Sequence, residues 1–83
     1  MPELTRLGNV RVRIFFNDTR QHRQPHFHAS SPDEDIVISI PDLATLAGSM
    51  RQPSYGRVIG WARASMAKLK ATWNQCNPQM PIP

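Results

Sequence analysis

The sequence predicts an α+β domain in which a three- to four-stranded antiparallel meander packs on one long C-terminal helix. Two patterns lead to this prediction. The first half of the 83-residue chain contains short segments of alternating apolar and polar residues, which is typical of half-buried strands. After residue 53 the apolar residues recur at spacings of four and three, which is typical of an amphipathic helix. Strands followed by a helix form the α+β pattern.

The strands are predicted at residues 10–16, 26–29 and 36–40, and residues 43–48 can form a fourth. In the first strand, the residues expected to face the core are Val10, Val12, Ile14 and Phe16. Because successive side chains of a strand point to opposite faces, the other face of the sheet should stay open. The side chains expected on that open face are Arg11, Arg13, Phe15, His26 and His28.

The helix is predicted from about Ser54 to Gln75, as a single element. Its apolar stripe consists of Tyr55, Ile59, Ala62, Met66, Leu69, Trp73 and Cys76. This stripe must be buried, and the inward faces of the strands are the apolar surface available to it. Residues 1–77 should therefore form a single α+β domain, and residues 78–83 a Pro-rich C-terminal tail.

Composition indicates a cytoplasmic protein that makes no membrane contact. The longest apolar run is three residues, whereas a membrane-spanning helix needs about 20. The N-terminus lacks the apolar region of a signal peptide. Cys76 is the one cysteine of the chain and cannot form an internal disulfide, which fits a reducing compartment.

Positive charge is concentrated in the C-terminal half of the chain. The formal net charge is +4, and no acidic residue follows Asp42. The basic residues after that position are Arg51, Arg57, Arg63, Lys68 and Lys70. Such a block attracts an anionic partner, either nucleic acid or a small cognate protein, and the alternative is a solvated helix face.

The candidate residues for binding an anion or a partner come from the open sheet face and from the helix. They are Arg11, Arg13, Arg57, Trp61, Arg63, Lys68 and Lys70. Trp61 has two interpretations because it lies off the centre of the apolar stripe. It either packs over the sheet edge, which we favour, or contacts a partner.

All three histidines lie within residues 22–28, and this cluster is the candidate site of the chain. Two histidines one residue apart on a strand share a face, so His26 and His28 can hold one ion together. His22 and Asp18 from the preceding loop complete a candidate ligand set for one divalent metal ion. Zinc, nickel, copper or iron would suit these nitrogen and oxygen ligands.

The same histidines also have a catalytic and a structural interpretation. His26 and His28 could act as general acid and base on a phosphodiester, with Arg11 and Arg13 holding the phosphate. Alternatively, the two histidines are polar side chains on an exposed face, or they line a protein contact.

The chain resembles the small bacterial proteins of domain-of-unknown-function family 4160. The matching segments are Phe16-Asn17-Asp18, His22, Pro25-His26-Phe27-His28-Ala29, Ser39-Ile40-Pro41-Asp42, Leu46-Ala47-Gly48-Ser49, Trp61-Ala62 and Trp73. The resemblance covers about residues 1–77. It implies a partner, since members are often encoded beside another small protein and toxin–antitoxin-like pairing has been suggested. This chain departs from the family in its helix, which carries Arg and Lys and no acid.

Two functional hypotheses follow. We favour a small intracellular binding module without catalytic activity, which contacts an anionic partner through the open sheet face and the basic helix. The alternative is a metal- or histidine-dependent enzyme of the phosphodiesterase type, centred on His22, His26 and His28.

Overall fold

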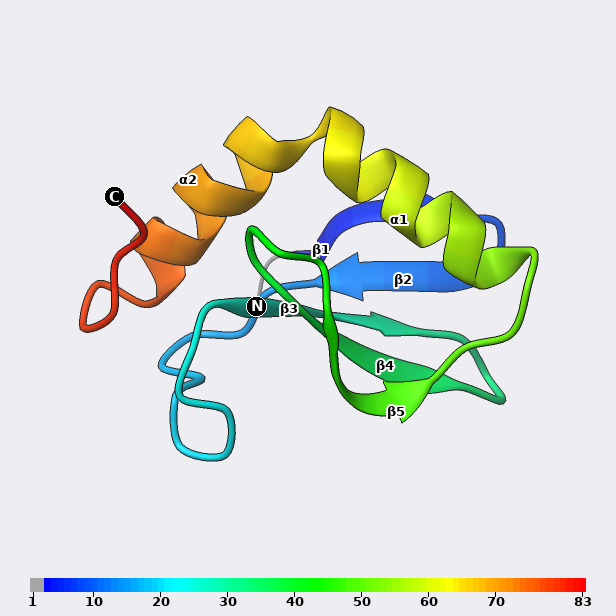
Figure 1. Cartoon of the computed structure of the whole chain (residues 1–83), viewed down its shortest axis with the longest axis horizontal. Helices are drawn as coiled ribbons and strands as arrows, with labels where there is room; N and C mark the ends of the chain where they lie inside the picture. The colour runs from blue at the N-terminus through cyan, green and yellow to red at the C-terminus, as the bar shows by residue number, and fades with distance from the viewer. Residues whose placement is uncertain (1–2) are drawn as a thin grey trace.

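A computed structural model describes residues 3–83 of the chain (Figure 1). The strands are β1 (Glu3–Leu7), β2 (Val10–Arg13), β3 (His26–Ser30), β4 (Asp35–Ser39) and β5 (Thr45–Ser49), and the helices are α1 (Ser54–Ala64) and α2 (Met66–Cys76). The strands form one sheet in the order β1-β2-β3-β4-β5, and all neighbours are antiparallel. The α+β class and the meander are therefore confirmed, whereas the predicted three to four strands and single helix are wrong in number.

The additional strand, β1, lies at the edge of the sheet and pairs with β2. Its sequence E-L-T-R-L does not alternate, because Leu4 and Leu7 are three residues apart. A register shift between Glu3 and Thr5 accommodates this spacing. At the opposite edge, β5 corresponds to the predicted fourth strand.

The first predicted strand is too long, because β2 ends at Arg13. Ile14 is buried as expected, but Phe16 is 56% exposed and does not face the core. The chain has left the sheet at this point, and Asn17 takes a left-handed conformation with φ of 52°. The alternation that predicted an inward Phe16 therefore stops three residues earlier than the sequence suggests.

The single predicted helix is two helices that meet at Ser65, where φ is −118° and ψ is 24°. Ala62, Leu69, Trp73 and Cys76 are buried as predicted. The apolar spacing continues through the junction, so the sequence pattern contains no sign of the bend. The bend has a clear consequence, since α1 lies across the sheet while α2 turns down past its end (Figure 1).

The core lies between the sheet and the helices. Its most deeply buried apolar residues are Val12, Ile14, Phe27, Ile38, Val58, Ala62, Leu69 and Trp73. Residues 78–83 pack back on α2, where the indole Nε1 of Trp73 donates a hydrogen bond to the Met80 carbonyl at 2.7 Å. The Asn74 side chain bonds both the amide and the carbonyl of Ile82. Within residues 3–83, no helix has the length and apolar character needed to cross a membrane.

Candidate metal centre

The site depends on the loop between β2 and β3, which carries Asp18 over the beginning of β3. Asn77, directly after α2, holds this loop in place. Its Oδ1 accepts a hydrogen bond from the Asp18 amide at 2.6 Å, and its Nδ2 donates to the Phe15 carbonyl at 3.0 Å. The Asn17 amide also donates to the Cys76 carbonyl at 3.2 Å. Because Asn77 is completely buried, the end of α2 fixes the position of Asp18.

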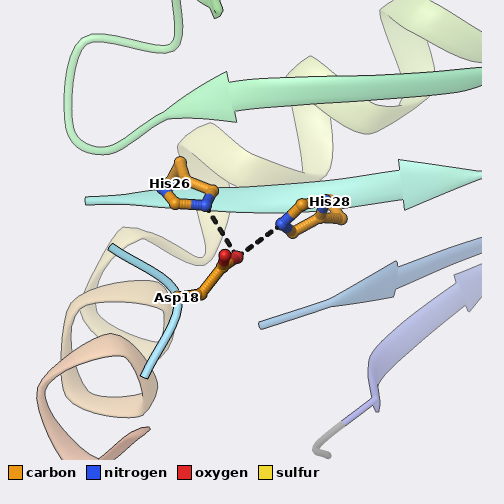
Figure 2. A group of neighbouring side chains, drawn as sticks. All are labelled: Asp18, His26 and His28. Atoms are coloured by element: carbon orange, nitrogen blue, oxygen red, sulfur yellow. Dashed lines mark hydrogen bonds and ion pairs between the residues drawn. The ribbon is translucent and has the colours of Figure 1, made fainter. Parts of the chain in front are cut away.

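Asp18, His26 and His28 converge on one point (Figure 2). A single oxygen of Asp18, Oδ2, lies 2.8 Å from Nε2 of His26 and 2.7 Å from Nε2 of His28. One ligand atom from each of the three side chains lies within 4.8 Å of the other two. Three of the four predicted metal ligands are therefore brought together.

His26 is buried, contrary to the expectation that it lies on an open face. Its side chain has no exposed area, whereas the side chains of His28 and Asp18 are 27% and 25% exposed. The bend between the helices brings Trp73 of α2 against the His26 ring, with 5.2 Å between ring centroids. The sheet face is therefore open at Arg13 and His28, but it is covered at the beginning of β3.

The second ring nitrogen of His26 also has a partner. Nδ1 lies 2.7 Å from the carbonyl oxygen of Gln24, which can only accept a hydrogen bond, so Nδ1 carries a proton. In a neutral ring, Nε2 then presents a lone pair toward Asp18. Two arrangements resolve this conflict: a second proton on Nε2, or a metal ion shared by Nε2 and the carboxylate. The second arrangement is the usual one for a metal-ligating histidine, whose other nitrogen donates to a carbonyl or carboxylate.

The pKa values of the two accessible groups favour the forms that bind metals. Burial alone raises the pKa of Asp18, but the hydrogen bonds from His28 and His26 outweigh it and hold the pKa below its usual range. Burial lowers the pKa of His28, and this effect outweighs the opposing effect of Asp18. At neutral pH, Asp18 is therefore a carboxylate and His28 a neutral imidazole, which are the forms that coordinate a cation.

The fourth predicted ligand, His22, lies outside this group. Its half-buried ring stands edge-on to that of His26, with 5.4 Å between the ring centroids. The rings of Phe15 and His28 meet similarly, with centroids 4.4 Å apart.

The candidate anion-binding residues fall into two groups. Arg11 and Arg13 lie on the open face, where their register partners on β3 are Ser30 and His28. The other basic residues belong to α1, which lies across the opposite face of the sheet, and to α2, which turns past its end (Figure 1). This second group is Arg57, Arg63, Lys68 and Lys70.

Two residues of the helices reach back to the sheet. Lys68 donates to the Leu4 carbonyl of β1 at 3.1 Å. Trp61 is half-buried, and its ring meets that of Phe27 edge-on with 6.4 Å between centroids, as expected from packing over the sheet.

Two contributors were missed at the sequence level. The Gln24 carbonyl is a backbone group that any residue supplies, so no side-chain pattern reveals it. Asn77 lies just beyond the predicted helix and directly before Pro78. Its position between a helix end and a proline gives no indication that it contacts a loop 59 residues earlier in the chain.

The comparisons with known proteins give one match. The family described as Domain of unknown function (DUF4160) matches residues 9–74 of the 83-residue chain. No curated protein and no solved structure shows significant similarity. The matched segment contains β2 to β5, α1, most of α2 and all three residues of the candidate centre. The resemblance noted in the sequence is thus confirmed, and the chain belongs to the DUF4160 family.

Proposed function

We propose that this domain binds one divalent metal ion through Asp18, His26 and His28 and uses it to hydrolyse a phosphate ester. The observation that supports the proposal best is the environment of His26. Its Nδ1 donates to a backbone carbonyl, and its Nε2 lies beside the carboxylate oxygen that also contacts His28. This arrangement has the ligand atoms of a metal site together with the outer partner that orients one of them.

The ligand set favours a catalytic ion over a structural one. Structural zinc sites usually have four protein ligands and many cysteines, whereas catalytic sites have three and leave one position for water. The partial exposure of Asp18 and His28 supports access of water to this position. Zinc fits best, and nickel or iron(II) is compatible with two histidines and one carboxylate.

A divalent ion held by Asp18, His26 and His28 would supply a nucleophile by lowering the pKa of a bound water to about 7. Hydrolysis forms a bond between the water oxygen and phosphorus and breaks the ester P–O bond, and the leaving oxygen takes a proton from solvent. The protein contributes the orientation of the ligands. Gln24 fixes the ring of His26, Asn77 fixes Asp18, and Arg13 beside His28 supplies positive charge for the substrate.

Metal binding is tested with protein that carries no His-tag. The purified protein is analysed for metals, stripped with EDTA, and melted with and without zinc chloride. We expect zinc to raise the melting temperature of the parent and of His22→Ala, but not of His28→Ala. His22→Ala is the matched control because it removes a neighbouring imidazole from outside the three-residue group. If zinc stabilises His28→Ala as much as the parent, or leaves the parent unchanged, the metal proposal is wrong.

Hydrolysis is tested separately with bis(4-nitrophenyl) phosphate. The zinc-loaded parent should release nitrophenolate, and EDTA or His28→Ala should abolish the release. If the protein binds zinc but releases no nitrophenolate, the metal site would stand and the hydrolytic part of the proposal would be wrong.

The second candidate function is a cytoplasmic binding module for an anionic partner, such as nucleic acid or the cognate protein of a toxin–antitoxin-like pair. Exposed cations on the helices with no acidic residue among them favour it. The test is titration of labelled DNA and RNA at two salt concentrations. Each phosphate that a side chain neutralises on duplex DNA adds about 0.9 to the slope of log affinity against log salt. Arg57→Gln with Arg63→Gln should weaken this binding, His28→Ala should not, and absence of binding at low salt removes the nucleic-acid form of this candidate.

A further inference from the structure

We infer that a hollow beside the candidate metal centre is a subsite for one phosphoryl group. The inference rests on the proposed function and names the group that the substrate presents. The hollow has a volume of about 290 Å³ and lies on the open face, between the β1–β2 turn, β2 and the end of β3. Its lining residues are Asn9, Arg11, Arg13, Ser30, Ser31 and Pro32.

Arg13, one of the lining residues, has a polar atom without a hydrogen-bond partner in the described part of the chain. Its Nε is buried, and within residues 3–83 no acceptor forms a hydrogen bond with it. Buried polar groups are nearly always paired, and leaving a charged donor without a partner is costly. Because Nε itself has almost no exposed area, a ligand oxygen can reach this N–H only when the Arg13 side chain turns toward the hollow.

The polar lining of the hollow offers donors for an anion. Asn9 contributes an amide, Ser30 and Ser31 contribute hydroxyls, and Arg11 and Arg13 contribute guanidinium groups. A guanidinium group can donate two parallel hydrogen bonds to two oxygens of the same phosphate.

The charge and the size of the hollow restrict the class of ligand that fits it. Glu3 holds Arg11 from the side, since one of its carboxylate oxygens lies 2.7 Å from Arg11 Nε. Within residues 3–83 the terminal nitrogens of Arg11 form no hydrogen bond, so they can contact a ligand. The volume of about 290 Å³ is at the lower end of the range for small-molecule pockets. It has room for one phosphoryl group, and the two guanidinium groups of the lining favour an anion over a neutral nucleobase.

The subsite and the metal centre adjoin through the sheet register. Arg13 of β2 lies directly opposite His28 of β3, so the two side chains are on the same face. Residues opposite each other in an antiparallel pair have Cα atoms about 4.5–5.5 Å apart. A phosphate ester held by Arg13 therefore places its phosphorus beside the water position that His28 and Asp18 border.

The test uses inorganic phosphate as the probe and the full chain as the protein. In the EDTA-treated parent, phosphate should shift the NMR resonance of the Arg13 Nε–H group. Arg13→Gln should weaken phosphate binding by about tenfold or more, as expected for loss of a charged hydrogen bond. The matched control is Arg6→Gln, which removes an exposed arginine that bonds Glu3 but does not line the hollow, and it should change the affinity by less than about twofold.

Four results are informative. If phosphate leaves the Arg13 Nε–H resonance of the parent unmoved, the inference is wrong whether or not Arg13→Gln folds. Equal affinities of Arg13→Gln and the parent would also overturn it. Because the titration is done without metal, phosphate binding that depends on Arg13 in a protein that takes up no zinc would support the subsite and reject the metal proposal. Zinc binding without phosphate binding would support the metal proposal and reject the subsite.

Discussion

Replacement of Asp18 by asparagine tests the centre directly, because the two side chains have nearly the same shape. Without metal, the carboxylate oxygen Oδ2 accepts hydrogen bonds at 2.7 and 2.8 Å from two imidazole rings, and Nε2 of the completely buried His26 then carries the second proton described above. A hydrogen bond to a charged group contributes about 1.5–3 kcal/mol and a neutral one about 0.5–1.5 kcal/mol. Asp18→Asn converts both bonds to the neutral kind, so we expect a loss of about 2 kcal/mol in the free energy of unfolding.

Thermal melting in EDTA measures this loss without a contribution from metal. For a domain of this size, 1 kcal/mol corresponds to about 4–8 °C, so Asp18→Asn should melt about 8–16 °C below the parent. The control is Asp42→Asn, in which the same change is made at an exposed turn after β4. If Asp18→Asn melted within about 2 °C of the parent, the two hydrogen bonds would not stabilise the fold and the geometry of the centre would be wrong.

Three further predictions concern the histidine, the core and the backbone. Burial lowers the pKa of His28 below 6.5, so the unfolded chain takes up this proton at a higher pH than the folded one. The free energy of unfolding in EDTA should therefore fall as pH drops below about 6.5, and His28→Gln should flatten this dependence. Trp73→Ala should cost about 3–5 kcal/mol in urea unfolding, because the ring is completely buried, and a loss below about 1 kcal/mol would contradict its place in the core. Gly48→Ala should destabilise the fold by more than about 1 kcal/mol, because φ is +74° and the new methyl group meets the Asp35 backbone. Gly60→Ala should stabilise the fold by about 0.5–1 kcal/mol, because its new methyl group meets no other atom. Equal melting temperatures of the two variants would contradict both expectations.

The sequence predicts β2, β3 and β4 because one face of each strand is apolar and buried while the other is mostly polar, so burial appears as alternation. This signal fails at β1, where a register shift interrupts the period of two. It also fails at Ser65, because a bend between two helices need not interrupt an apolar stripe. The number of strands and helices therefore differed from the prediction although the class was correct.

The candidate site could be predicted only in part, for a related reason. The alternation of side chains along a strand correctly placed His26 and His28 on the same face of β3, and the polar loop before this strand suggested Asp18. This alternation does not reveal what covers that face, however, and the burial of His26 results from Trp73, 47 positions further along the chain. Contacts over such separations depend on the path of the whole chain, which no local pattern records.

The hydrogen bond between the Asp18 amide and Asn77 joins residues 59 positions apart, and this separation has a consequence for synthesis on the ribosome. The meander pairs each strand with the one made just before it, so the sheet can form progressively as the chain emerges. The loop that carries Asp18 obtains its anchor only after α2 has been made and has docked. On the proposed function, metal would therefore load late in the maturation of the protein. A nascent chain that ends before residue 77 lacks the Asn77 side chain that positions Asp18, so bound metal would distinguish complete molecules from interrupted ones.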